Sequence, residues 1–222
     1  MTLPLGIFLY IIIGVACYLL GSISSSIILG KAIYGIDVRE HGSCNPGATN
    51  TQRVLGWRMG LFVLFFDMFK GIAAASVVYL LPFKSYTEGF VSTQILFGLI
   101  AMMGHIFPIF HNFKGGKGVA TLCGVLLMLH PYCFLICFAI FCIVLTITRY
   151  VSVSVITAVS CFPFFVNFIF AMLLNPKETD TIRIFSIIAA IIIWLCHISN
   201  LKRLWKGTEP KLIFKKKPLV KQ

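Results

Sequence analysis

A polar segment interrupts an otherwise apolar chain at 42–53, where the sequence reads GSCNPGATNTQR. Its glycines and the Asn45-Pro46 turn let backbone N–H groups point into one concavity, and Arg53 can bring a planar guanidinium to phosphate oxygens. The other residues that we expect to contribute are Ser43, Gly47, Thr49 and Asn50. This first polar segment predicts an oxyanion or phosphate site, although a loop that only caps a helix uses the same residue types.

A second polar segment of similar chemistry lies at 113–121, with the sequence FKGGKGVAT. Glycines permit close backbone approach, lysines supply charge, and the helix expected from Val119 favours an anion at its N-terminus. The nucleotide-binding spacing GxxxxGK[ST] is absent, because Gly118 follows Lys117. We predict a phosphate cradle here, with an interfacial basic turn as the alternative. The residues of the cradle are Lys114, Gly115, Gly116, Lys117 and Gly118.

Two pairs of polar residues nearer the C-terminus could take part in the same chemistry. Arg149 and Ser152 stand at the head of an apolar run and could bind a further anion, or serve as a snorkelling arginine and a helix cap. His197 and Asn200 are three residues apart, so a helix places them on one side. His197 could act as a base near neutral pH, while Asn200 could orient it or donate to an oxyanion. No spacing of histidine and cysteine predicts a metal site.

Two charged residues, Asp67 and Lys70, lie three apart inside an apolar run, where a helix lets them neutralise each other. Because charges in a bilayer are costly, both should face the interior of a helix bundle, in a structural or a catalytic ion pair. We expect His105, at the end of the next apolar run, to shape the second polar segment.

The composition indicates a polytopic membrane protein, since 59% of the 222 residues are hydrophobic and 12% are charged. A helix needs about twenty apolar residues to cross the hydrocarbon core. His130-Pro131 divides one long apolar stretch into two. The apolar runs are 3–29, 55–82, 90–110, 119–129, 132–148, 150–174 and 182–199.

The distribution of lysine and arginine orients these runs, because cationic loops of membrane proteins stay in the cytoplasm. We predict one all-α domain over 1–222, a membrane helix bundle of about seven transmembrane helices, some short, with the N-terminus outside and the C-terminus cytoplasmic. Five crossings is the alternative, if the hairpin at 119–148 and a neighbour stop short. The net charge of +12 concentrates in a cytoplasmic tail, 201–222, and its juxtamembrane position favours anionic lipid headgroups over nucleic acid.

Seven motifs occur in a fixed order along nearly the whole chain. They are Gly21-Ser22-Ile23, the first polar segment, Asp67-x-x-Lys70-Gly71, Gly104-His105-x-Phe107-Pro108, the second polar segment, Arg149-x-x-Ser152 and His197-x-x-Asn200. Together they closely resemble the bacterial acyl-phosphate:glycerol-3-phosphate acyltransferase family. Two positions depart from its pattern, since Ser24 stands where proline is common and Cys44 where glycine is common.

The resemblance implies a multi-pass enzyme of the bacterial inner membrane that transfers a fatty acyl group from acyl phosphate to the 1-hydroxyl of glycerol 3-phosphate, an early step of phospholipid biosynthesis. The products are lysophosphatidic acid and phosphate. No cofactor is implied, and a soluble acyl-phosphate synthase is a candidate partner. The resemblance also implies essential roles for Ser43 and Arg53, a glycerol-phosphate cradle at 114–118 and a structural Glu209.

Acyl phosphate carries a good leaving group, so the protein mainly needs to bind two anions side by side and polarise a carbonyl. We expect direct attack by the substrate hydroxyl, with His197 or a substrate phosphate oxygen taking the proton. The residues assigned to catalysis are Ser43, Asn45, His197 and Asn200. An acylated Ser43 is the alternative mechanism. Two other classes of protein could carry similar sites: an organic-phosphate transporter, and a noncatalytic membrane anchor for a soluble acyl-phosphate synthase.

Overall fold

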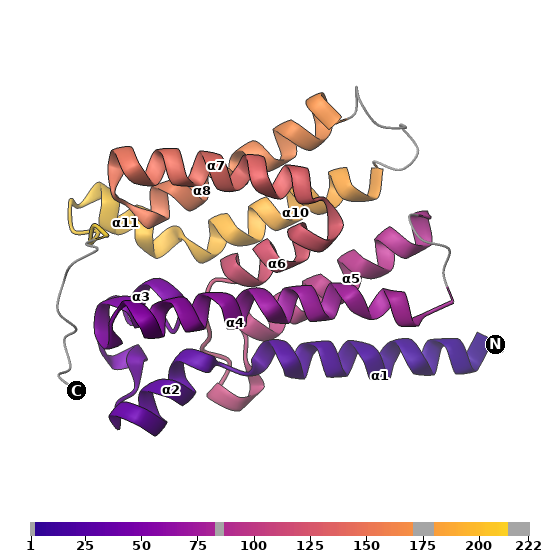
Figure 1. Ribbon diagram of the computed structural model, residues 1–222, viewed down its shortest axis with the longest axis horizontal. Helices are drawn as coiled ribbons and strands as arrows, with labels where there is room; N and C mark the ends of the chain where they lie inside the picture. Colours follow the sequence, from indigo (N-terminus) through magenta and orange to yellow (C-terminus); the bar gives the residue numbers. More distant parts are fainter. Residues whose placement is uncertain (1–2, 83–86, 171–179, 213–222) are drawn as a thin grey trace. The chain divides into compact units, whose positions relative to one another are not determined.

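Helices are the regular secondary structure of the part of the chain that the computed structural model describes, residues 3–82, 87–170 and 180–212 (Figure 1). Packing groups these residues into two compact units. Unit 1 contains the described residues of 3–82 and 93–125, and unit 2 contains those of 87–92 and 126–212. A helix forms in every predicted apolar run, which confirms the all-α fold class. The single domain over 1–222 stays a prediction.

Unit 1 holds the N-terminal helices and both polar segments. Helices α1, α2 and α3 all pack against α4 (Figure 1). The bounds are α1 Leu3–Ser22, α2 Ser25–Tyr34, α3 Ala48–Leu55 and α4 Trp57–Ser76, with short 3₁₀ helices η1 Val38–Glu40, η2 Val77–Leu80 and η3 Ile109–His111. Two further helices, α5 (Glu88–Ile106) and α6 (Val119–Leu129), each have one end in unit 2.

The first apolar run is a broken helix. Ser24 has φ −87° and ψ 89°, outside the helical region, and α1 and α2 meet there at an angle of 43°. The chain therefore breaks at the position where serine replaces the common proline. A φ of −87° is near the range that a proline ring would impose, so the backbone at Ser24 has a φ close to one that proline could adopt.

Glycines bring α4 and α6 into close contact. A Cβ atom on Gly71 of α4 would overlap the carbonyl oxygen of Thr121, and one on Gly124 of α6 would overlap the carbonyl oxygen of Met68. Small residues let two membrane helices approach backbone to backbone in this way. The contact fixes the beginning of α6, and with it the end of the second polar segment, against α4.

Unit 2 contains the C-terminal helices, of which α8 packs against both α7 and α10 (Figure 1). Pro131 opens α7 and the His130 side chain accepts a hydrogen bond from the Cys133 N–H at 3.2 Å, which confirms the predicted helix break. Helices α10 and α11 meet at 53° around His197. The bounds are α7 Pro131–Thr148, α8 Val151–Phe164, the π-helix η4 Phe165–Phe170, α10 Asp180–Cys196 and α11 Ile198–Trp205.

Four helical stretches are long and apolar enough to cross a membrane, and the two bent pairs raise the number to as many as six within the described residues. The four stretches are Trp57–Leu80, Glu88–His111, Pro131–Thr148 and Val151–Phe168. Helix α6 has 11 residues, about half of the length that a full crossing requires. Seven crossings and the orientation of the termini stay predictions.

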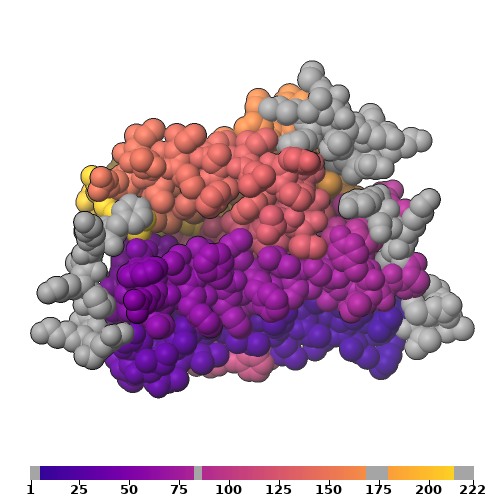
Figure 2. Space-filling model, viewed as in Figure 1, coloured from indigo at the N-terminus to yellow at the C-terminus, as the bar shows by residue number. Residues whose placement is uncertain are grey.

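The helix surfaces agree with lipid contact. Figure 2 shows α7 (salmon) and α4 (purple) at the surface of the molecule, and both expose large apolar side chains. On α4, Phe62, Phe65 and Phe69 are exposed at helical spacing, while Asp67 and Lys70 are buried on another face. The polar pair therefore faces the protein interior, as predicted from the cost of charge in hydrocarbon.

Candidate active site

The first polar segment is organised around Asn50, which is buried near the start of α3. Its Nδ2 donates to the carbonyl oxygens of Val38 at 2.9 Å and His41 at 3.0 Å. Its Oδ1 accepts the backbone N–H of Ser43 at 2.8 Å. Both amide protons and the carbonyl oxygen therefore bind the main chain of this segment. Asn50 therefore shapes the loop that carries Ser43. The sequence predicted that its amide would contact a phosphate, whereas the structure shows it hydrogen-bonded to the backbone.

The tip of this segment is a left-handed turn. Gly42 has φ 64° and Cys44 has φ 58°, and a Cβ on Gly42 would overlap Oδ1 of Asn50. Cys44 thus adopts a conformation that glycine accepts at a lower cost, by about 1–2 kcal/mol. Its side chain is exposed, so the departure from the family's glycine changes the surface of the loop without filling its interior.

Helix α3 begins directly behind this turn, with Gly47 as its N-cap in an extended conformation and no side-chain cap. The Ser26 Oγ donates to the Pro46 carbonyl at 2.6 Å, which ties the turn to the start of α2. Asn45 and Thr49 flank the N-cap and are half-buried, and Arg53 lies one turn further along, also half-buried. The segment therefore presents a helix N-terminus, amide and hydroxyl groups and one guanidinium, a combination that suits an anion.

The second polar segment folds back on the end of α5. The N–H groups of Gly115 and Gly116 donate to the carbonyl oxygens of Ile106 at 3.2 Å and His105 at 3.1 Å. A Cβ on Gly115 would overlap the His105 carbonyl oxygen, and one on Gly116 would overlap Nε2 of the His105 ring. These two glycines thus serve close packing, and their N–H groups are bound to protein carbonyls. The expected influence of His105 on this segment is confirmed.

Two lysines and the N-terminus of α6 lie in the second segment, and groups of these kinds favour an anion. Lys114 is exposed and Lys117 is half-buried, and both precede the first turn of α6. Gly118 has φ 76° and its carbonyl accepts the Leu122 N–H at 2.8 Å, so α6 begins where the sequence predicted. Two cations and a helix N-terminus therefore meet within five residues.

A buried charge cluster lies behind this segment in unit 1. Asp67 Oδ1 is 2.7 Å from Lys70 Nζ and 3.6 Å from His105 Nδ1. All three side chains are buried, and the Lys70 ammonium also lies 5.2 Å from the centre of the Phe66 ring. The pair neutralises itself as predicted, and it holds the histidine ring that packs on Gly116.

The third polar cluster, in unit 2, is organised by Glu209. Its Oε1 accepts hydrogen bonds from Ser152 Oγ at 2.9 Å and Asn200 Nδ2 at 2.6 Å, and its Oε2 lies 2.7 Å from Arg203 Nε. Burial raises the pKa of Glu209, but the hydrogen bonds from Asn200, Arg203 and Ser152 lower it further, so the net pKa lies below its ordinary value. Glu209 is thus an ionised anchor, in agreement with the structural role that the resemblance implied.

His197 and Arg149 border the same cluster. His197 is buried between α10 and α11, and its Nδ1 is 2.8 Å from the Ile193 carbonyl oxygen. A carbonyl only accepts, so Nδ1 carries the proton and Nε2 is the basic nitrogen of the neutral ring. Arg149 ends α7 with φ 60°, and its carbonyl oxygen accepts the Leu212 N–H at 2.7 Å.

Sequence reasoning missed two functional candidates, Arg39 and Arg203. Arg203 follows Asn200 by three residues on α11, a spacing that could have placed both on one helix face. Arg39 follows Asp37 by two residues just before the first polar segment, and this acidic-basic pair is the only local signal for it.

Comparison with known proteins shows similarity over nearly the whole chain. A family model described as glycerol-3-phosphate acyltransferase matches residues 11–207. A relative of that name from Chlorobaculum tepidum is 39% identical, with 94% of this chain and 98% of the relative covered. Another, from Macrococcus caseolyticus, is 42% identical, with 90% of this chain and 95% of the relative covered.

Two crystal structures of PlsY, described as an integral membrane glycerol 3-phosphate acyltransferase, have the same fold. The glycerol 3-phosphate form has a TM-score of 0.79 at 32% identity, covering 92% of this chain and 96% of that protein. The lysophosphatidic acid form has a TM-score of 0.76 at 31% identity over the same shares.

The helical fold, the apolar helices and the similarity to known acyltransferases over nearly the whole chain define a multi-pass membrane acyltransferase. The chain belongs to the glycerol-3-phosphate acyltransferase family. This confirms the resemblance and the prediction of an enzyme of phospholipid biosynthesis, and it decides against the transporter and the noncatalytic anchor.

Proposed function

We propose that this enzyme transfers a fatty acyl group from acyl phosphate to the 1-hydroxyl of glycerol 3-phosphate. The bond between the acyl carbon and the phosphate oxygen breaks, a new ester bond forms to the glycerol oxygen, and inorganic phosphate leaves. The observation that carries the proposal is the presence in unit 1 of two polar segments that each contain a helix N-terminus and at least one cation, Arg53 in the first segment and Lys114 and Lys117 in the second. A reaction between two phosphate-bearing substrates needs two such anion sites.

The roles of the individual residues follow from their surroundings. Ser43 and Asn45 donate to a phosphate or to the developing oxyanion at the tip of the first segment. Phosphate oxygens contact Gly47, Thr49 and Arg53 in the first segment, Lys114, Lys117 and Gly118 in the second, and Arg149 in unit 2. Asn50, Gly115, Gly116 and Ser152 act through the backbone or carboxylate contacts that hold these groups in place.

Direct attack by the substrate hydroxyl is the mechanism that we propose. Phosphate is a good leaving group, so the enzyme needs positioning and charge stabilisation more than a covalent intermediate. The hydroxyl proton goes to Nε2 of His197 or to a phosphate oxygen of a substrate. Asn200, held by Glu209 at 2.6 Å, fixes the start of α11 immediately after His197.

The membrane context agrees with this chemistry. The apolar helices hold the acyl chain and let a lipid product leave sideways into the bilayer. We propose that the protein resides in the bacterial inner membrane with both polar segments on the cytoplasmic side, where a soluble synthase would supply acyl phosphate.

The decisive experiment supplies palmitoyl phosphate and glycerol 3-phosphate to the detergent-purified protein and measures phosphate and lysophosphatidic acid. We expect both products in equal amounts, and we expect Arg53→Ala to raise the KM for a phosphate substrate or abolish turnover without unfolding the protein. Palmitoyl thioesters serve as the comparison donors. Turnover with a thioester but not with acyl phosphate would reject the proposed donor, and full activity of Arg53→Ala would reject the role of the first segment.

A further inference from the structure

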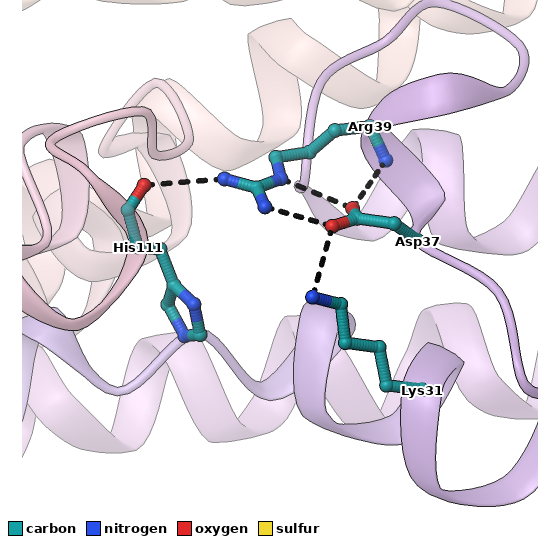
Figure 3. A network of polar contacts seen from close by, with 4 residues as sticks. All are labelled: Lys31, Asp37, Arg39 and His111. Carbon is teal, nitrogen blue, oxygen red and sulfur yellow. Dashed lines mark hydrogen bonds and ion pairs between the residues drawn. The ribbon is translucent and has the colours of Figure 1, made fainter.

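A polar network outside the predicted substrate contacts joins the two polar segments of unit 1 (Figure 3). Asp37 caps η1 by accepting the Arg39 N–H at 3.0 Å, and the same carboxylate receives Arg39 Nε at 3.0 Å and Nη2 at 2.7 Å. These hydrogen bonds from Arg39 hold the pKa of Asp37 well below its usual range. The guanidinium is therefore neutralised and fixed in one plane by a two-point contact.

The third nitrogen of this guanidinium reaches the other segment. Arg39 Nη1 donates to the carbonyl oxygen of His111 at 3.1 Å, across 72 residues of sequence (Figure 3). The same carbonyl oxygen accepts the N–H of Lys114 at 3.2 Å. Arg39 thus binds the turn that leads directly into the lysines and glycines of the second polar segment.

The backbone on either side of Arg39 is also hydrogen-bonded to the first polar segment. The carbonyl oxygens of its neighbours Val38 and His41 hold the amide of Asn50, and Asn50 holds the N–H of Ser43. A movement of η1 would therefore shift Ser43 on one side and Lys114 on the other. A single side chain links the backbones of both anion sites.

We propose that Arg39 is a positioning residue that sets the separation and the orientation of the two polar segments, with Asp37 holding its guanidinium. The inference rests on the proposed role of these segments in binding the two substrates. Arg39 acts through the carbonyl oxygen of His111, because its charge is already neutralised by Asp37. Catalysis that depends on two anions held side by side is sensitive to small errors in their separation.

Lys31 provides a matched control. Its Nζ lies 3.4 Å from Oδ2 of the same Asp37, and its side chain is 59% exposed (Figure 3). Lys31→Gln and Arg39→Gln each remove one positive charge from one carboxylate, but only Arg39 also contacts His111. Arg39→Lys keeps the charge and loses the fork that lets one side chain bind Asp37 and His111 together.

The kinetic test compares these three variants in the full-length protein with acyl phosphate and glycerol 3-phosphate. We expect Arg39→Gln and Arg39→Lys to raise the KM for glycerol 3-phosphate about tenfold, the effect of one lost charge-assisted hydrogen bond. Lys31→Gln should stay within about twofold of the parent, as surface ion pairs do. An Arg39→Lys enzyme with parental constants would show that charge alone matters and would overturn the proposal, as would equal effects of Lys31→Gln and Arg39→Gln.

Amide hydrogen exchange tests the link without substrates, so it separates a failure of this inference from a failure of the proposed donor. In Arg39→Gln and Arg39→Lys we expect the peptide covering 111–116 to exchange about tenfold faster, while α7 keeps the parental rate. In Lys31→Gln, the exchange rates of the 111–116 peptide and of α7 should both match those of the parent. If Arg39→Gln does not fold, Arg39→Lys carries the test. Parental exchange at 111–116 in a folded Arg39 variant would overturn the proposal.

Discussion

At the scale of single residues, Asn50 and Glu209 do the same work in two polar clusters. Each is a buried side chain that forms several hydrogen bonds at once: Asn50 binds three backbone groups, and Glu209 binds Ser152, Asn200 and Arg203. A residue of this kind controls activity through the geometry of its neighbours. Its loss should therefore affect stability and turnover together.

Asn50→Asp tests this for the first polar segment. Aspartate keeps the acceptor for the Ser43 N–H but loses both donors and places a negative charge beside two carbonyl oxygens. We expect the free energy of unfolding to fall by about 1–3 kcal/mol and turnover to fall with it. Thermal unfolding in detergent measures the stability, and the kinetic assay measures the turnover. Parental stability combined with lost activity would instead make Asn50 a substrate ligand.

Glu209→Gln tests the third cluster through pH. The folded-state pKa of Glu209 lies below its unfolded value, so its charge stabilises the fold fully above the unfolded value of about 4.3. That stabilisation is lost as the pH falls through the lower, folded-state pKa. We expect Glu209→Gln to lower the Tm at pH 7, and the difference from the parent to shrink as the pH falls below about 4. If the difference in Tm between the parent and Glu209→Gln did not change with pH, the stabilising role of an ionised Glu209 would be rejected.

At the scale of elements, the second polar segment is held by packing against α5. Gly115 and Gly116 lie so close to His105 and Ile106 that no side chain fits, and their N–H groups complete the hydrogen bonding of the helix end. Asp67 and Lys70 on α4 support the His105 ring from the other side. Two helices, α4 and α5, therefore determine the path of this short loop.

Gly116→Ala should displace this loop, because the added Cβ would overlap Nε2 of His105. We expect a loss of turnover of about a hundredfold, the cost of moving a substrate-positioning group by about an ångström. Gly14→Ala is the control, since its Cβ would meet Ile100 at an ordinary 3.5 Å. In a His105→Ala background the further loss from Gly116→Ala should be much smaller. Additive effects of the two substitutions would refute the contact.

For the molecule as a whole, we expect the positions of the apolar helices and of the cationic segments to set its orientation in the membrane. Both polar segments carry exposed groups beside long apolar helices, and Cys44 is the exposed cysteine of the eight in the chain. The predicted cytoplasmic face of the first polar segment can therefore be probed at that thiol.

Membrane-impermeant maleimide should label Cys44 in inverted membrane vesicles and leave it unlabelled in intact cells. The reason is the predicted orientation, in which cationic segments remain in the cytoplasm. Cys44→Ser is the control, because it removes the exposed thiol and leaves the seven others in place. Labelling in intact cells would reverse the predicted topology.

Local features of the sequence were sufficient to predict the helices and the class of chemistry. Each long apolar run must satisfy its own backbone hydrogen bonds in lipid, so it becomes a helix whatever its neighbours do. The break at His130-Pro131 follows from local geometry in the same way, and the two polar segments follow from their glycines and cations. These properties depend on residues that are adjacent in the chain, and the structure confirms the helices in the apolar runs, the break and the start of α6.

The three-dimensional contacts were needed to show which of the predicted polar groups bind other parts of the protein. Asn50, Gly116 and Ser152 looked like anion ligands because their types and positions suit one, yet each binds protein groups in the fold. Arg39 was not identified from the sequence. The partners lie 7 to 12 residues away for Asn50, 57 residues away for Ser152 and 72 residues away for Arg39. A hydrogen bond is specific to a few tenths of an ångström, and no local pattern encodes such a distance between remote residues.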